Sequence, residues 1–239
     1  MSSFTVMPLG DKGIRIDLGN VISPAINSYV HQLGELVEKR SIAGIEEVVP
    51  AYSTLTIYYN PIIISYESLK LQLTELGSKL SPSAKWKRRK IILPVFYGGI
   101  LGPDLEYIAR YHSLSIDDVI QIHAKPVYLT YMIGFSPGFP YLGGLDKRLA
   151  TPRRSNPRKK VLAGSVGIAG SQTGVYSIDS PGGWQIIGRT PVPLFRPNDK
   201  EPTLFQAGDY LQFQSITKEE YESIADECLR GVYKTVIQL

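Results

Sequence analysis

The 239-residue sequence contains a single cysteine, Cys228, and this scarcity excludes two kinds of site. One thiol can form neither a disulfide within the chain nor a cysteine-based metal site, and such usage favours a reducing compartment. No three His, Asp, Glu or Cys residues stand at the spacing of metal ligands either. We therefore predict no bound metal and a cytoplasmic location.

The sequence also lacks an apolar run that would direct the chain to a membrane. Its first residues have neither the basic nor the apolar region of a signal peptide. Residues 127–145 carry no charge and are long enough for a membrane span, but four glycines and two prolines interrupt them. We read this segment as strands and turns, and we predict no membrane partner.

No large excess of one charge is present, since the formal net charge is only +4. The bases are nevertheless clustered, first in KWKRRK at 85–90 and then in a second group consisting of Lys147, Arg148, Arg153, Arg154, Arg158, Lys159 and Lys160. Phosphate neutralisation would explain such groups, but no nucleic-acid recognition motif with interleaved aromatic residues accompanies them. We therefore predict no nucleic-acid partner and favour solvated loops or a site for an acidic ligand.

Two common catalytic motifs are missing as well. Residues 134–138 match G-x-S-x-G, but the oxyanion hole of such enzymes uses the backbone N–H after the serine, and here Pro137 has none. The catalytic histidine should also follow Ser136, whereas all three histidines precede it. The absence of any Gly-Lys dipeptide excludes a P-loop. Ser136 is therefore predicted to lie in a turn.

Residues 1–85 alternate between strand and helix patterns. Runs at 4–9 and 13–18 indicate a hairpin, and 46–59 is strand-like. Ser23-Pro24 and Ser65 are typical of helix starts, and 91–96 supplies a further strand. This order predicts a small two-layer α+β domain with helices on one face of a mainly antiparallel sheet, ending in the polar, basic segment 81–90.

Residues 86–239 show a different pattern of predicted helices and strands. Pro103, Ser115-x-x-Asp118 and Thr217-x-x-Glu220 each begin a short helix, and Cys228 lies on the apolar side of the last one as a buried structural thiol. Between 127 and 216, short β-rich runs are separated by Gly, Pro, Ser and Asn, which is typical of a barrel or sandwich. We predict a mainly-β domain with flanking helices.

Several polar side chains in this second domain are candidates for binding. His123 lies on the apolar face of its helix, so it is either a satisfied core histidine or a functional acid–base group. We favour the functional interpretation because the chain runs from His123 directly into the aromatic, glycine-rich strand. Arg153, Arg154 and Arg189 can each bind a carboxylate or phosphate through two parallel hydrogen bonds.

Residues 131–192, which contain YMIGFSPGFPYLGGL and SPGGWQIIGRT, resemble the signature of the family of 5-oxoprolinase B subunits. That family includes the sporulation-kinase inhibitor of bacilli and is similar to allophanate hydrolase subunit 1. A looser resemblance extends over the whole chain, including PVFYGGILGPDLEYIA and His123. It implies an α+β domain over 1–85 followed by a cyclophilin-like β-barrel domain over 86–239.

The resemblance also implies two alternative functions. In the first, the chain is one subunit of an ATP-dependent 5-oxoprolinase and works with subunits A and C to cleave 5-oxoproline to L-glutamate. ATP is then bound by the complex, since nothing in this sequence indicates a self-contained ATP site. In the second, the chain is a non-enzymatic inhibitor of autophosphorylation by a sporulation sensor histidine kinase, antagonised by the sister subunit.

A site follows from this interpretation. We predict His123 as the acid–base group, with Arg153 and Arg189 as the residues that hold an anion. Residues 134–144 then form a strand and turn that line a pocket, and Gln172 and Tyr176 orient the substrate. The predicted substrate-binding residues are Phe135, Phe139, Tyr141, Gln172 and Tyr176. Much of 131–192 is expected to be shared with an interface to the C subunit.

Overall fold

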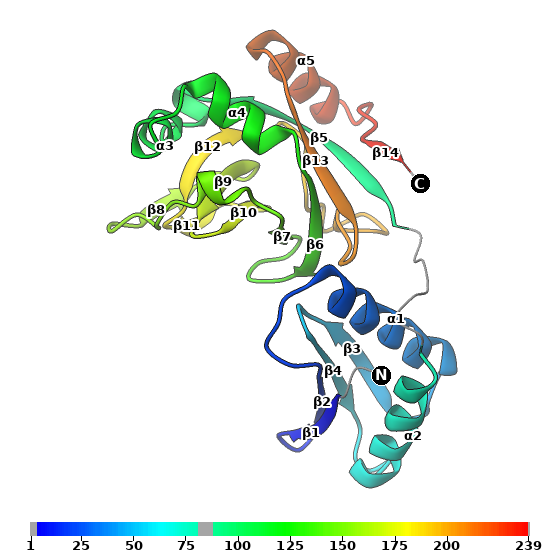
Figure 1. Cartoon of the computed structure of the whole chain (residues 1–239). Coiled ribbons are helices and arrows are strands. Elements are labelled where there is room, and N and C mark those ends of the chain that lie inside the picture. Colours follow the sequence, from blue (N-terminus) through cyan, green and yellow to red (C-terminus); the bar gives the residue numbers. More distant parts are fainter. Residues whose placement is uncertain (1–3, 81–87, 239) are drawn as a thin grey trace. The chain divides into compact units, whose positions relative to one another are not determined.

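The computed structural model describes residues 4–80 and 88–238. The chain divides into two compact units, Met1–Lys87 and Arg88–Leu239 (Figure 1). The boundary predicted between 85 and 86 lies outside the described residues and stays a prediction.

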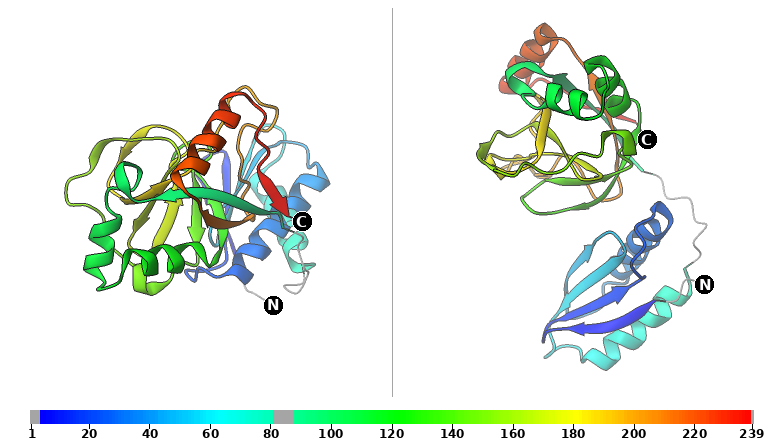
Figure 2. Two further views of the ribbon diagram at one scale, coloured as in Figure 1. Left: turned by 90° about the horizontal axis from the view of Figure 1, so that it is seen from above. Right: turned by 60° about the vertical axis from the view of Figure 1, so that its left-hand side comes forward.

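The N-terminal unit is a four-stranded antiparallel sheet with two helices on one face (Figure 2). Its strands occur in the order β1-β2-β4-β3 and are β1 (Thr5–Leu9), β2 (Gly13–Asp17), β3 (Ile45–Pro50) and β4 (Thr54–Tyr59). The helices are α1 (Pro24–Arg40) and α2 (Tyr66–Ser78). Both begin where the sequence predicts, because the side chains of Ser23 and Ser65 accept hydrogen bonds from backbone N–H groups of the first turn.

The run 46–59, predicted as a single strand, is in fact a hairpin of β3 and β4. The chain reverses at 51–53, where the Ala51 N–H donates to the Thr54 carbonyl oxygen at 2.9 Å. The turn contains no glycine or asparagine, and the local reversal signal is limited to Pro50 directly before it and Ser53 within it. β4 buries one face in the core, with Leu55 and Ile57 fully inaccessible, whereas β3 is at most partly buried.

The C-terminal unit contains a closed seven-stranded β-barrel. Around the ring the strands are β12 (Gln185–Arg189), β9 (Ser165–Ala169), β10 (Gln172–Val175), β7 (Pro140–Gly143), β6 (Val127–Ile133), β13 (Tyr210–Ser215) and β5 (Lys90–Tyr97). Pairing of β12 with β5 closes it. The β5–β13 pair is parallel and the other pairings in the ring are antiparallel. The strand over 91–96, which the predicted order grouped with the first domain, therefore belongs to the barrel.

Short elements surround the barrel. The helices are α3 (Leu105–Tyr111), α4 (Ile116–Ala124) and α5 (Lys218–Leu229), and the two 3-10 turns are η1 (Gly99–Leu101) and η2 (Lys147–Leu149). The strand β14 (Val236–Gln238) pairs with residues 90–92 of β5. The strands β8 (Arg158–Val161) and β11 (Ser180–Gly182) form a separate two-stranded ribbon. The predicted capping boxes of α4 and α5 are both formed, by Ser115 with Asp118 and by Thr217 with Glu220. Cys228 is only partly buried, which corrects the prediction of a buried thiol.

The barrel encloses most of the apolar core of this unit. Fully buried side chains come from β5, β9, β10, β12, β13 and the helices α3 and α4, and include Ile91, Leu93, Val95, Ile108, Val119, Val166, Ile168, Val175, Ile187 and Leu211. Within residues 4–80 and 88–238, none of the helices combines the length and the apolar character that crossing a bilayer requires.

Candidate functional site

His123 lies in the core of the barrel unit and is fully buried. Its Nε2 is 2.8 Å from Thr173 Oγ1, and its Nδ1 is 2.8 Å from the Tyr97 hydroxyl. Thr173 already donates its hydroxyl proton to the Gly167 carbonyl oxygen at 3.0 Å, so it accepts from Nε2–H, and Tyr97 donates to Nδ1. Burial lowers the pKa of His123 to about 3, which keeps the ring neutral.

This environment is that of a satisfied core histidine, the other interpretation that the sequence left open. The rings of Phe213, Tyr97 and Tyr128 surround the imidazole, with centroids 4.5, 5.7 and 5.7 Å away. Because both ring nitrogens are paired and the side chain has no solvent access, direct contact with a substrate requires a change in the core. An acid–base role for His123 stays a prediction.

Four of the five predicted substrate-binding residues form an aromatic cluster. The ring of Phe139 meets those of Phe135, Tyr141, Tyr176 and Trp184 edge-on, with centroids 5.2–5.7 Å apart. Phe139, Tyr176 and Trp184 are buried, whereas Phe135 is 68% exposed. The cluster is therefore a second small core, and Phe135 is the member most available to a ligand or partner.

The remaining predicted substrate-binding residue, Gln172, is half-buried at the start of β10. Trp184 belongs to the aromatic cluster but was not singled out from the sequence, although it follows the glycine pair at 182–183 in the signature.

Ser136 lies in the tight turn between β6 and β7. The Phe139 N–H donates to the Ser136 carbonyl oxygen at 3.1 Å, and Gly138 has a φ of +75°. The Ser136 hydroxyl is 3.2 Å from that of Ser177. The predicted turn is confirmed, and the strand-to-helix geometry of a nucleophile elbow is not formed here.

Arg189 lines a cavity of about 360 Å³ between the end of β12 and α5, which we call the Arg189 pocket. Its apolar walls include Pro191, Val192, Pro193, Leu194, Phe195, Tyr221, Ala225 and Leu229. Arg189 Nε donates to the Ala163 carbonyl oxygen at 2.8 Å, and the terminal nitrogens make no hydrogen bond or ion pair with other described residues. A mainly apolar cavity with one guanidinium suits a small acid that has a compact apolar body.

The wall of this pocket requires a glycine. Gly164 has a φ of +83°, and a Cβ there would collide with the Thr190 carbonyl oxygen. The two residues are joined by a hydrogen bond from the Thr190 N–H to the Gly164 carbonyl oxygen at 2.9 Å. Close backbone approach therefore shapes the pocket next to Arg189.

A second arginine-bearing cavity, of about 420 Å³, lies at the start of α3. We call it the Asp104 pocket, and it is lined by Asp104, Tyr107, Arg153, Arg154, Ser155, Asn156 and Gln185. Asp104 is 4% exposed and accepts hydrogen bonds from Arg154 at 3.0 Å and from the Ile186 N–H at 2.6 Å. Both terminal nitrogens of Arg158 lie 2.9 Å from its carboxylate oxygens. One buried carboxylate thus holds two guanidinium groups.

The structure does not bring the predicted catalytic set together. Arg153 lines the Asp104 pocket, Arg189 lines the other pocket, and His123 lines neither. Asp104 and Arg158 were not assigned to a site from the sequence, because Asp104 lies 54 residues before Arg158 and nothing local joins them.

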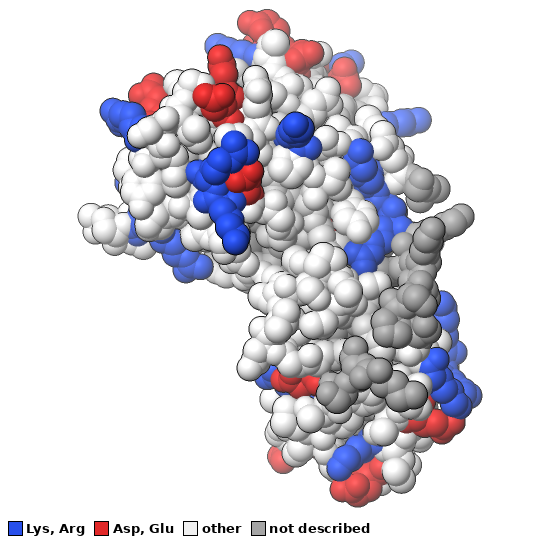
Figure 3. Space-filling model, viewed as in Figure 1, with Lys and Arg blue, Asp and Glu red and all other residues white. Residues whose placement is uncertain are grey.

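Two of the four other basic residues of the second group, Arg148 and Lys160, form ion pairs. Arg148 contacts Asp146 at 2.8 Å and Lys160 contacts Asp179 at 2.8 Å, both at the surface. Part of the 85–90 group lies outside the described residues. On the face shown in Figure 3, Lys and Arg side chains form separate groups with acidic residues among them, and not one continuous basic surface.

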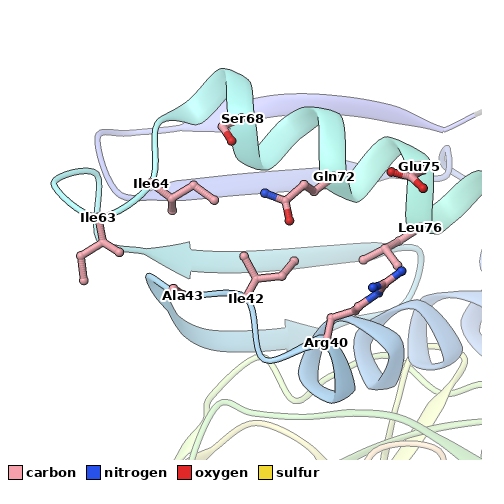
Figure 4. A pocket seen from close by; sticks show the side chains of 9 residues that line it. All are labelled: Arg40, Ile42, Ala43, Ile63, Ile64, Ser68, Gln72, Glu75 and Leu76. Atoms are coloured by element: carbon pink, nitrogen blue, oxygen red, sulfur yellow. The ribbon is translucent and has the colours of Figure 1, made fainter.

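The N-terminal unit has a cavity of its own, of about 520 Å³, between α2 and the connection from α1 to β3. Figure 4 shows Gln72 of α2 and Ile42 facing one another across it, with Arg40 and Glu75 at one end. It contains no predicted site residue. Within the described parts of both units, no three His, Cys, Asp or Glu side chains are grouped so that they could hold a metal ion.

Comparison with known proteins decides the family. The carboxyltransferase domain family, subdomains C and D, matches residues 4–205. The chain is 43% identical over 234 residues to the 5-oxoprolinase B subunit of Bacillus subtilis (strain 168), and the match covers 94% of this chain and 98% of that protein. The chain belongs to the family of 5-oxoprolinase B subunits. The resemblance of residues 131–192 to this family is thus confirmed.

Solved structures are also similar to the chain. A conserved uncharacterized protein from Pyrococcus horikoshii is 48% identical, with a TM-score of 0.55, and the match covers 91% of this chain and 100% of that one. The urea amidolyase of Kluyveromyces lactis is 22% identical with a TM-score of 0.77, covering 98% of this chain and 16% of that one. At this identity the second comparison shows a shared fold alone.

Proposed function

We propose that the chain is the B subunit of an ATP-dependent 5-oxoprolinase, which cleaves 5-oxoproline to L-glutamate together with subunits A and C. The observation that carries this proposal is the match to the Bacillus subtilis 5-oxoprolinase B subunit, which spans 94% of this chain and 98% of the relative. Because it extends over both units, the match concerns the whole architecture and not a single shared domain. The cyclophilin-like character of the barrel belongs to the same proposal.

The proposed reaction explains the use of ATP. The C–N bond of the lactam breaks, the hydroxyl of one water joins the carbonyl carbon, and its proton ends on the nitrogen. A second water is consumed overall as ATP becomes ADP and phosphate. An amide carbonyl is a poor electrophile, and transfer of a phosphoryl group to its oxygen would lower the barrier to attack by water. In this proposal ATP is bound by the assembled complex.

We propose the Arg189 pocket as the place where the chain holds its substrate. 5-Oxoproline is a compact ring that carries one carboxylate, and the pocket combines mainly apolar walls with one guanidinium. The bond from Nε to Ala163 fixes Arg189 before a ligand arrives, which lowers the entropic cost of binding. His123 would act from a distance, since its bonds to Tyr97 and Thr173 join β5 to β10 inside the barrel.

Reconstitution tests this function. Purified subunits A and C with this chain should release glutamate from 5-oxoproline in the presence of ATP, and omission of the chain should abolish release. Arg189→Ala should raise the KM for 5-oxoproline about 30-fold, because a charge-assisted hydrogen bond contributes about 2 kcal/mol. Arg230→Ala, which removes an exposed arginine at the end of α5, is the matched control. Glutamate release that is undiminished without this chain would refute the proposal.

The surface around Phe135 is the proposed contact with the C subunit. Phe135 and Pro137 are exposed, whereas Phe139 and Pro140 of the same stretch are buried. Aromatic side chains are enriched at the centres of protein interfaces. Phe135→Ala should weaken co-elution of the two proteins in size-exclusion chromatography, while Tyr111→Ala, which removes another exposed aromatic side chain, should leave it unchanged.

The alternative function, inhibition of a sporulation sensor histidine kinase, is favoured by the same exposed residues. The docking surface that the stretch 135–140 offers is limited, because the ring of Phe139 is buried. Kinase autophosphorylation measured against increasing amounts of the chain tests this role. No slowing at saturating protein would exclude it for the kinase used.

A further inference from the structure

We propose that the Asp104 pocket binds the phosphate group of a small phosphorylated ligand. The pocket contains the basic residues Arg153 and Arg154, which the proposed reaction leaves unused, and it is separate from the Arg189 pocket. The argument rests on the charge balance of the pocket, the fixed position of its donors and the groups on its rim.

The arginine side chains in the pocket and in contact with Asp104 carry more positive charge than the single carboxylate neutralises. Arg154 and Arg158 share the single carboxylate of Asp104, and Arg153 makes no ion pair with the described residues. Three guanidinium groups against one carboxylate leave two positive charges, and Asp104 is the one acidic residue among those that line the cavity. A phosphate monoester carries about −1.5 to −2 at pH 7 and matches this surplus, whereas a carboxylate would neutralise only half of it.

The donors are held in place before a ligand arrives. The Ile186 N–H and Arg158 fix the carboxylate of Asp104, which in turn fixes Arg154. The backbone N–H of Arg154 also donates to the Gly183 carbonyl oxygen at 2.8 Å, so the loop itself is anchored. Donors fixed in this way bind an anion with little loss of side-chain freedom.

Arg154 offers a donor that the protein does not use. Its Nε is buried and has no hydrogen-bond partner among the described residues. Guanidinium groups bind phosphate oxygens through pairs of parallel N–H bonds, which matches a group whose other edge is held by Asp104. Ser155 and Asn156 add neutral hydrogen-bonding side chains to the same cavity.

The cavity is larger than a phosphate group needs, and its rim is aromatic. A volume of about 420 Å³ lies within the range of small-molecule sites. Tyr107, which lines the cavity, is 41% exposed, and its ring centroid is 5.8 Å from that of Tyr111, which is 52% exposed. A flat base can stack on such rings, so the phosphate has two candidate sources, a nucleotide or a free phosphate ion.

Calorimetric titration of the purified full chain tests the proposal without any catalytic turnover. ATP, ADP, inorganic phosphate and adenosine are titrated separately. We expect the phosphate-bearing ligands to bind and adenosine alone to bind at least about tenfold more weakly, in line with the strength of charged hydrogen bonds. Tighter binding of ATP and ADP than of phosphate identifies a nucleotide as the source, and equal binding identifies free phosphate.

Substitution of Arg153 gives the sharper test, because this exposed side chain has no ion pair whose loss would unfold the loop. Arg153→Gln should weaken phosphate-dependent binding about tenfold or more, and Arg153→Lys by less, since lysine keeps the charge but not the paired donors. Lys159→Gln removes the same charge outside the pocket and should change nothing.

Two results would overturn the proposal: equal affinity of the parent and Arg153→Gln, or no binding of any phosphate-bearing ligand. The arginine cluster would then only connect the loop to α3. Binding that is lost in Arg153→Gln while glutamate release fails in the reconstituted system would support the phosphate site and refute the proposed function, so the two failures are distinguishable.

Discussion

Two buried ionisable side chains in the barrel unit, His123 and Asp104, are accommodated in opposite ways. His123 is surrounded by aromatic rings and bonded to two neutral hydroxyl groups, so the core accepts it without charge. Asp104 is bonded to two guanidinium groups and a backbone N–H, so it is buried as a carboxylate. A neutral polar side chain whose hydrogen bonds are all made inside the core can join the strands around it. A buried charged side chain needs partners of opposite charge, and these partners extend to the surface.

This difference indicates a structural role for His123 and a ligand-binding role for the group around Asp104. The partners of His123 are all internal, and none of them lines either arginine-bearing pocket. The partners of Asp104 reach a solvent-accessible cavity and leave positive charge there. Burial alone therefore does not identify a functional residue, and the location of its partners is more informative.

The largest expected effect comes from removing the charge of Asp104. Asp104→Asn leaves Arg154 and Arg158 close together without their shared counter-charge. We expect a loss of about 2–4 kcal/mol in the free energy of unfolding, less than for a fully buried pair because these arginine side chains are 36% and 24% exposed. Urea unfolding measures this. Asp146→Asn, which removes a surface carboxylate paired with one arginine, is the control and should change stability little. A stable Asp104→Asn variant would show that the cluster does not depend on its carboxylate.

Acid should destabilise the protein through His123. The histidine of the unfolded chain has a pKa near ~6.5, whereas the pKa of the folded one is lowered to about 3, so unfolding takes up a proton between these pH values. The His123 contribution is constant above pH ~6.5 and falls at up to ~1.4 kcal/mol per pH unit below it.

Urea unfolding of the parent and of His123→Gln at several pH values isolates this contribution. The stability difference between the two should shrink as the pH falls from 7 towards 4. Parallel pH profiles would mean that His123 is already accessible to protons in the folded barrel.

Thr173 tests the bonding partners of His123. Thr173→Val keeps the shape of the side chain but leaves the Nε2–H of His123 unpaired in the core and removes the bond to the Gly167 carbonyl oxygen. We expect a loss of about 1–3 kcal/mol in the free energy of unfolding. Thr173→Ser retains the hydroxyl group and should cost less. A Ser variant as unstable as the Val variant would assign the effect to the methyl group.

The smallest effect is expected at the start of the helix that carries His123. The Ser115 hydroxyl accepts from the Asp118 N–H at 3.0 Å, and Asp118 accepts from the Ser115 N–H at 3.2 Å. Ser115→Ala should cost about 1 kcal/mol in thermal or urea unfolding. Ser171→Ala, in the turn between β9 and β10, provides a comparison at an exposed serine whose hydroxyl makes no hydrogen bond with the described residues. Equal stability of both variants would contradict the capping contribution.

Local features of the fold could be predicted from the sequence, because the groups involved are neighbours along the chain. Ser23, Ser65, Ser115 and Thr217 each bond to an N–H three residues later, so the helix starts are visible as short patterns. The β3–β4 turn has no such pattern and was read as a continuous strand.

The candidate sites depend on distant residues, which explains why less of them could be predicted. Arg153 and Arg189 were recognised by residue type, but nothing local assigns them to different pockets. Asp104 meets Arg154 and Arg158 across 50 and 54 residues. The interior of the barrel determines the partners of His123, since Tyr97 and Thr173 come from β5 and β10.

The position of β5 in the chain determines when the barrel can close. β5 is its first strand, yet its ladder partners β12, β13 and β14 belong to the last third of the sequence, with β13 beginning at Tyr210. The N-terminal unit, in contrast, contains all of its own strand partners. During synthesis on the ribosome that unit can fold early. At that stage β5 has no ladder partners, and the side chains of Ile91, Leu93 and Val95, which are buried in the folded barrel, are exposed to solvent. Newly made chains interrupted before β13 would therefore expose an apolar strand edge, the state in which chaperones are most needed.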